Sequence, residues 1–346
     1  MKRMILIVVT VFALAQPVAA VEFTAPQVPQ SGESLMPEDT TSFADGLLEL
    51  VKKALNSVRP DLKAAGTGCM GMLGIVLTLS LLQAFPGKKA NSCELVGAVA
   101  IGVLLLKETN TMIHLGTETV ADVSTYGTLL LPVMTAALAA QGGITGSAAL
   151  YTGTAFFNSV LSNLISNILR PMIYLFLALS VANCAVEENV LKQFRDFIKW
   201  LMVWSLKWIL YIFTGYMGIT GVVSGTTDAA TLKATKLTIS GMVPVVGNIL
   251  SDASEAVLVS AGVVKNAAGI YGILAIGAVC LGPFLKIGLH YLMLKATAAL
   301  CGVFGSKRIT GLIGDFSGAM GLLLAMTGSV CLLFLISVVC FLKGVG

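Results

Sequence analysis

Charged residues are scarce in this chain. Of its 346 residues, 12% are Asp, Glu, Lys or Arg and 56% are hydrophobic, whereas about a quarter of a typical soluble domain is charged. The hydrophobic residues form long blocks: Tyr126–Val186 contains one charge, Arg170, and Phe316–Leu342 contains none. Because about 20 apolar residues cross a bilayer, these blocks predict an all-α, polytopic transmembrane protein without a soluble catalytic domain.

Recognisable catalytic and metal-binding motifs are also missing. The sequence contains no G-x-S-x-G, H-E-x-x-H or Walker A pattern, and none of its seven cysteines has C-x-x-C or Cys/His metal spacing. We therefore predict no enzyme activity, no catalytic residue, no metal and no cofactor. The net charge is only +4, and basic pairs such as Lys88-Lys89 and Lys307-Arg308 stand at segment ends. That placement suits a lipid bilayer and the positive-inside rule, and no nucleic-acid partner is expected. It puts both pairs inside, with the segment after residue 20 and the carboxyl terminus outside.

The amino-terminal part divides into a leader and a polar segment. Residues 1–20 have two basic residues, a short apolar core and a small-residue end, which predicts a secretory signal peptide; an uncleaved first helix is the alternative. Residues 21–65 are predicted to be extracytoplasmic and partly disordered. They include a short amphipathic helix that ends near Arg59, because Pro60 disfavours helix at the residue before it. Residues 66–345 form the membrane domain, with about 6–8 apolar segments.

Two of these segments predict special membrane geometry. Cys93–Leu106 is short for a complete crossing, which favours a tilted or re-entrant piece. Residues 187–199 place Val190, Phe194 and Phe197 on one helical face and charges on the others. That pattern predicts an interfacial helix lying on the membrane.

A third irregularity lies at residues 240–266. Gly241, Pro244 and Gly247 interrupt helix formation, which predicts a broken or re-entrant helix. Asp252 and Glu255 follow, three residues apart on one face. At membrane depth these acids would need partners, and they form the proposed intramembrane polar centre together with nearby or facing lysines: Lys207, Lys265, Lys286 and Lys295. An interfacial helix with both acids in headgroup water is the alternative.

Polar residues also recur at helical spacing in two places. A slanted stripe consists of Asn158, Ser159, Ser162, Asn163, Ser166, Asn167 and Arg170. Such a stripe can hydrogen-bond to another helix or line a water path, and the helix contact is the commoner role. His114, Glu118 and Asp122 are four residues apart, which predicts a solvated helix face more readily than a metal site.

The block from Lys236 to Leu274 resembles a known family. It contains V-P-V-V-G-x-x-L-S-D-A-x-E followed by V-K-N-A-x-G, and the chain closes with RITGLIGDFSGAMGLLLAMTGSVCLLFLISVV. These features resemble the stage III sporulation protein AE family of endospore-forming bacteria. The resemblance implies a subunit of a channel or export complex in the mother-cell-derived outer forespore membrane. It also implies other membrane subunits and a separate cytoplasmic ATPase as partners, and it supplies no catalytic residues.

An independent secondary transporter or permease is the alternative function. Its substrate site would be the broken helix around Pro244, since transporters bind substrates at interrupted helices near the bilayer midplane. Those helices usually come in pairs from internal repeats, and the short echoes at residues 144, 219 and 309 do not establish a repeat. The leading interpretation is therefore a non-enzymatic sporulation channel subunit.

Overall fold

The protein is described by a computed structural model that covers residues 26–38, 43–83, 90–186, 189–242, 247–304 and 307–343. Within the helices, side chains are described except at residues 82–83, 90–95, 186, 189, 221–242, 247–261 and 304. The described part is helical and contains no strand. A short helix, α2 (Gln30–Glu33), precedes the long ones, which are α3 (Phe43–Gln83), α4 (Ala90–Ala140), α5 (Ile144–Asn163), the π-helix η1 (Leu164–Leu169), α6 (Arg170–Val186), α7 (Asn189–Met242), α8 (Gly247–Phe304) and α9 (Lys307–Lys343).

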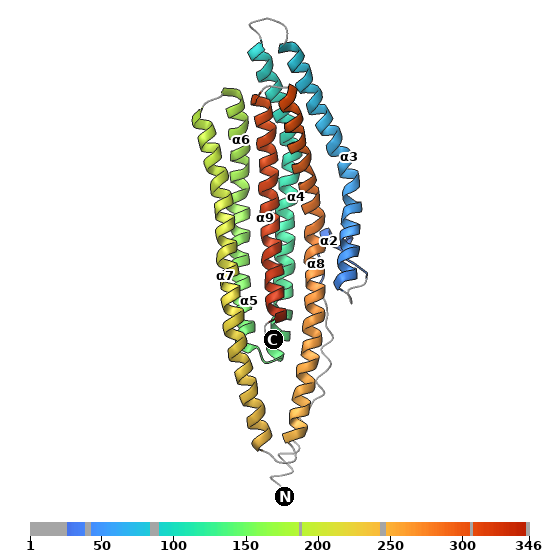
Figure 1. The fold of residues 1–346 in the computed structure, drawn as a ribbon, viewed down its shortest axis with the longest axis vertical. Coiled ribbons are helices and arrows are strands. Elements are labelled where there is room, and N and C mark those ends of the chain that lie inside the picture. Colours follow the sequence, from blue (N-terminus) through green and yellow to red (C-terminus); the bar gives the residue numbers. More distant parts are fainter. Residues whose placement is uncertain are drawn as a thin grey trace.

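The long helices form six rods that run up and down beside one another (Figure 1), with α5, η1 and α6 as one continuous rod. Each rod is long and apolar enough to cross a membrane, which confirms the predicted all-α, multi-pass fold. Helices α4, α7 and α9 begin at one end, which is the upper end in Figure 1, and α9 runs toward the other. Lys307 begins α9 at this end, whereas Lys88-Lys89 and Gly346 lie outside the described residues, so the predicted sidedness stays a prediction.

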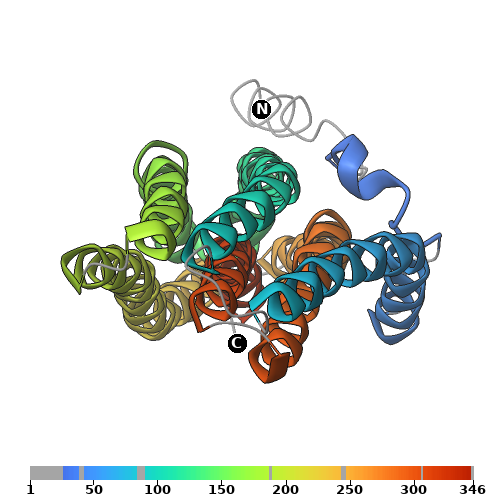
Figure 2. The same cartoon turned by 90° about the horizontal axis from the view of Figure 1, so that it is seen from above.

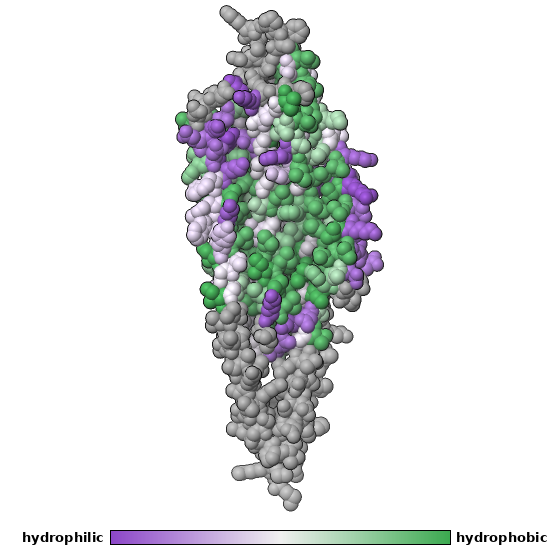
Figure 3. All heavy atoms as spheres, in the orientation of Figure 1, coloured by the Kyte–Doolittle hydropathy of each residue, from purple (hydrophilic) through white to green (hydrophobic). Residues whose placement is uncertain are grey.

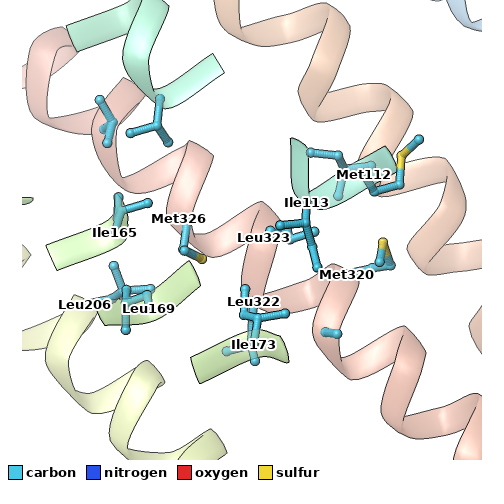
Figure 4. Close-up of a cluster of buried hydrophobic side chains, with 14 of the residues drawn as sticks. Met112, Ile113, Ile165, Leu169, Ile173, Leu206, Met320, Leu322, Leu323 and Met326 are labelled. Carbon is cyan, nitrogen blue, oxygen red and sulfur yellow. The ribbon is translucent and has the colours of Figure 1, made fainter. Parts of the chain in front are cut away.

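Helix α9 occupies the centre of the bundle (Figure 2) and packs against α4, α5, α6, α7 and α8. It is the most hydrophobic of the six candidate spans, and a helix that is hydrophobic all round is a buried helix. Figure 4 shows the consequence: Leu323 of α9 points toward Ile113 of α4, while Leu322 points toward Ile173 of α6. One central helix therefore holds the surrounding helices together through apolar contacts.

Glycine permits one of these contacts. A β-carbon at Gly127 of α4 would lie 2.0 Å from Cε1 of Phe334, a fully buried ring on α9. Small residues of this kind let membrane helices approach closely. By contrast, a β-carbon at Gly215 of α7 would meet nothing within 4 Å.

We expect Gly127→Ala to destabilise the bundle by about 1–3 kcal/mol, because overpacking a tight core forces rings and backbone to move. The matched variant Gly215→Ala should be neutral or stabilising by up to about 1 kcal/mol, since alanine is the better helix former. Thermal unfolding of the detergent-purified chain measures both. Equal melting temperatures for the two variants would contradict the close α4–α9 contact.

Two helices are continuous where the hydropathy pattern predicts separate segments. Helix α4 continues from Cys93–Leu106 through the polar stretch to Ala140, so the predicted re-entrant piece at Cys93–Leu106 is wrong, while a tilted helix stays a prediction. No break occurs because the polar residues from 107 to 124 are helix-compatible and contain no proline. Helix α8 likewise continues through Pro283. Apolar length decides where lipid can lie, but backbone hydrogen bonds decide where a helix ends.

Helix α3 also continues past the expected stop. Pro60 lies inside Phe43–Gln83, so the predicted short helix ending near Arg59 is wrong and the boundary after residue 65 falls within α3. An internal proline removes one backbone hydrogen bond and costs about 3 kcal/mol. Packing against α8 on both sides of the proline offsets that cost, because Leu50 and Met72 are both buried.

The segment before α3 has a definite structure where it is described. In residues 26–38, Leu35 packs with Leu50 and Ala278, and Ser31 Oγ donates a hydrogen bond to Asp122 at 2.6 Å. Gly32 lies so close to Val279 that a β-carbon would approach its backbone nitrogen to 2.9 Å. Disorder is therefore the wrong expectation for this part, because even one leucine and a close glycine contact can anchor a short segment to a long helix.

The predicted interfacial helix is likewise not a separate element. Residues 189–199 are the first turns of α7, which runs without a break to Met242. A continuous rod cannot lie flat on the membrane at one end and cross it at the other. Val190, Phe194 and Phe197 are nonetheless exposed, as expected from their shared face.

Candidate functional site

The structure does not bring the predicted intramembrane polar centre together. Lys286 pairs with Asp61 of α3, with 3.1 Å between Nζ and Oδ1, and Lys207 is exposed on α7. Asp252 and Glu255 belong to α8, but their side chains lie outside the described residues. Because α8 is continuous and rises about 1.5 Å per residue, Asp252 and Lys286 are about 50 Å apart. One centre containing both is excluded by that length.

Lys265 is the buried member of the predicted set, with 6% of its surface exposed. No ion pair or hydrogen bond to it occurs among the described side chains. The predicted helix break falls at the α7–α8 connection: Gly241 lies in the last turn of α7 and Gly247 is the first residue of α8. Pro244 lies outside the described residues, so the broken-helix substrate site stays a prediction.

The predicted polar stripe divides into an inner and an outer part. The inner part binds α4: Ser124 Oγ donates to Oδ1 of the buried Asn158 at 3.0 Å, and Ser162 Oγ donates to Ser124 Oγ at 3.1 Å. These bonds are the helix–helix contact that the spacing favoured. The outer part is exposed and consists of Ser159, Asn163, Ser166, Asn167 and Arg170.

A π-helix accompanies the outer part. Helix η1 covers Leu164–Leu169, and the Asn167 amide donates to Asn163 Oδ1 at 2.9 Å across its first turn. A π-turn inside an α-helix frequently marks a functional position, because the wider turn redirects the side chains beside it. The sequence spacing alone did not predict this change of helix type.

Helix α4 contributes a second polar face at the same height. His114 and Glu118 are exposed and lie 3.1 Å apart between Nδ1 and Oε1, and Tyr174 of α6 donates to Asn110 of α4 at 2.7 Å. The Ser124 contacts join the same two rods further along. We call the combined surface the polar waist: Lys107, Asn110, Thr111, His114, Glu118 and Asp122 of α4, with Ser159, Asn163, Ser166, Asn167 and Arg170.

The polar waist cannot be kept out of a membrane that α4 crosses. The apolar stretches on its two sides, Leu95–Leu106 and Tyr126–Ala140, contain twelve and fifteen residues, or about 18 and 22 Å of helix. The hydrocarbon core is about 30 Å thick. Either stretch therefore needs residues of the waist to complete a crossing, and those residues must face water or protein rather than lipid.

A basic cavity lies at the upper end of the bundle, between α6, α7 and α9. Its volume is about 360 Å³, and its lining includes Lys192, Lys307 and Arg308. Hydrophilic side chains gather near this end on the face shown in Figure 3, while α8 and α9 present a hydrophobic surface below.

An ion pair forms one wall of the basic cavity. Arg195 of α7 binds Asp315 of α9 through Nη1, and its Nη2 lies 2.9 Å from Oδ1 of Asp196. The Arg195 and Asp315 side chains are only 11% and 17% exposed. Sequence reasoning missed this contact, because 120 residues separate the partners. The available signal was weak: Asp315 is the acid nearest to the start of the charge-free block at Phe316.

The described residues contain no group of three or more His, Cys, Asp or Glu side chains that could hold a metal ion. Four cysteines are buried, namely Cys69, Cys184, Cys280 and Cys301. They contribute small apolar surfaces to the helix contacts.

Comparison with known proteins identifies the family. The stage III sporulation protein AE family matches residues 38–344. Stage III sporulation protein AE of Bacillus subtilis (strain 168) is 25% identical over 235 residues, which cover 68% of this chain and 59% of that relative. The match thus spans less than two thirds of the relative's length. No solved structure matches. Because the family match covers nearly all of the six-helix bundle, the chain belongs to the stage III sporulation protein AE family.

Proposed function

We propose that this chain is a non-enzymatic membrane subunit of the channel or export complex between mother cell and forespore. Family membership supports a sporulation role, and six long apolar helices support a multi-pass location. Within this proposal the chain lies in the mother-cell-derived outer forespore membrane. Its partners are the other membrane subunits of the complex and a separate cytoplasmic ATPase, since the sequence has no nucleotide-binding motor motif.

The polar waist is the observation that carries this proposal. A charged side chain at the centre of a membrane helix costs about 2.5–3.5 kcal/mol on the insertion scale, and the waist exposes His114, Glu118 and Arg170 on the outside of the single chain. Within the part of the chain that the structure describes, these three side chains are left exposed, because the packed core lies around α9. Further subunits that close around a water-filled path would solvate the waist.

The test is water access at the waist. We expect Asn163→Cys and Asn167→Cys to react with a membrane-impermeant thiol reagent in sporulating cells that contain the whole complex. Val103→Cys, an exposed apolar position on α4 above the waist, should react poorly because it faces lipid. A background in which the two half-buried native cysteines, Cys331 and Cys340, and also Cys93 are replaced keeps the signal specific.

Equal, low reactivity at all three positions would contradict a water path along the waist.

Transport by the purified chain distinguishes the proposed channel subunit from the alternative, an independent secondary transporter. Reconstituted alone in liposomes, a channel subunit should show no saturable uptake coupled to an ion gradient. Such uptake by the isolated chain would instead support a secondary transporter.

A further inference from the structure

The basic cavity carries more positive charge than its one lining acid can neutralise. Four of its lining residues are basic, and Asp315 is its lining acid. Arg195 is occupied by two carboxylates, those of Asp315 and Asp196. Lys192 and Lys307 make no ion pair with a described residue, and both reach the cavity from the first turns of their helices.

We infer that the basic cavity binds a phosphate group through Lys192, Lys307 and Arg308. The site is concave and large enough to enclose such a group, since binding pockets begin at about 300 Å³. Asn183 adds a neutral side-chain donor to the lining. The partly buried Arg195–Asp315 pair fixes α7 against α9 and so holds the lysines in place. This inference does not depend on the proposed channel role.

Helix direction favours an anion in the same place. Helix α9 begins at Lys307 and α7 begins at Asn189, so both helices start beside the cavity. The amino-terminal end of a helix carries partial positive charge and unpaired N–H groups, which stabilise bound phosphate. Topology alone explains basic residues at this end, but it does not explain why three of them line one cavity together with the partly buried Arg195.

The position also fits a lipid headgroup. All three tryptophans of the chain, Trp200, Trp204 and Trp208, form an exposed ladder on α7 one to four turns beyond Arg195. Tryptophans concentrate at the membrane–water interface, and basic pockets between membrane helices bind phosphate-bearing headgroups. A soluble phosphate compound would meet the same basic side chains, so the experiment separates the two sources.

The experiment measures binding to the full, detergent-purified chain with three probes: phosphatidylglycerol, phosphatidylcholine and inorganic phosphate. Retention of the lipids is followed by native mass spectrometry and binding of phosphate by calorimetry. We expect phosphatidylglycerol to bind more tightly than phosphatidylcholine. Lys192→Gln with Lys307→Gln should weaken that binding about tenfold or more, because the variant loses two charge-assisted hydrogen bonds to the phosphate.

A matched pair at Gly311 tests the cavity without removing a lysine. Gly311 lines the cavity, and a β-carbon there meets nothing within 4 Å. Gly311→Glu places a carboxylate in the cavity, whereas Gly311→Gln adds the same bulk without charge. We expect the glutamate variant to bind phosphatidylglycerol much more weakly than the glutamine variant.

Lys88→Gln with Lys89→Gln is the charge control, since it removes two positive charges from residues outside the described cavity lining. Tight, variant-sensitive binding of inorganic phosphate would support the site and identify a soluble source. Equal retention of phosphatidylglycerol by all variants, including Gly311→Glu, would overturn the inference. So would equal retention of both lipids by the wild-type chain together with no phosphate binding.

Discussion

Asp315→Ala should markedly lower the stability and membrane abundance of the protein. The substitution leaves the Arg195 guanidinium, which is 11% exposed, without its main partner on α9. Breaking a buried ion pair costs about 3–5 kcal/mol, and an exposed pair contributes about 0–1 kcal/mol. Because this pair retains some contact with solvent, we expect a loss of about 2–3 kcal/mol. Thermal unfolding in detergent and immunoblots of membrane fractions measure it.

A double variant distinguishes lost charge pairing from lost shape. Arg195→Met with Asp315→Leu replaces both partners by apolar side chains, a change that is often neutral or stabilising for a buried pair. We therefore expect the double variant to recover most of the stability that Asp315→Ala loses. Glu118→Gln is the surface control, since the His114–Glu118 pair is more than 60% exposed and its loss should cost less than about 1 kcal/mol. A double variant as unstable as the single one would show that the ion pair is not the cause.

The sequence predicts helix content and membrane character well because both depend on local composition. Residues Phe316–Leu342 are an example, because this block without charges predicts a membrane span. Its uniform hydrophobicity also agrees with the central position of α9 in the bundle. Helix ends were harder to predict. Pro60 and Pro283 disfavour helix locally, yet α3 and α8 continue through them, because tertiary contacts on both sides outweigh one lost hydrogen bond.

The candidate functional residues were likewise predictable where the signal is local in sequence and not where it depends on tertiary contacts. Asn158 and Ser162 were recognisable as helix-contact residues because their spacing is local, and the structure supplies their partner on α4, Ser124. The polar centre around Asp252 failed as one unit because it required Lys286, and the length of α8 separates the two. The Arg195–Asp315 pair and the basic cavity could not be predicted, since they depend on how α6, α7 and α9 meet in space.

Replacing exposed polar-waist residues with leucine should abolish sporulation while leaving the single chain folded. The proposed triple variant is His114→Leu, Glu118→Leu and Arg170→Leu, all of which change exposed side chains. The direction of the effect depends on what covers the waist. If lipid covers it, each leucine removes a polar group that costs up to about 3 kcal/mol at membrane depth. The variant would then be more stable and fully functional.

If water or another subunit covers the waist, the same variant loses the hydrogen bonds and solvation that the assembly provides. Three such losses at the centre of an interface typically reduce affinity by on the order of a hundredfold or more. We therefore expect normal membrane abundance but a fall of at least about a hundredfold in heat-resistant spores, with loss of co-purifying subunits. The assay uses a spore-forming host that depends on this chain.

The matched control replaces three exposed polar residues of α3 that lie outside the waist: Lys52→Leu, Asn56→Leu and Lys63→Leu. It adds the same number of leucines to the bundle surface, so general insolubility would appear in both triples. Spore counts should stay near wild type for the control and collapse for the waist variant. A waist variant that sporulates normally and melts at a higher temperature than the wild type would place the waist in lipid and remove the structural basis for a water path there.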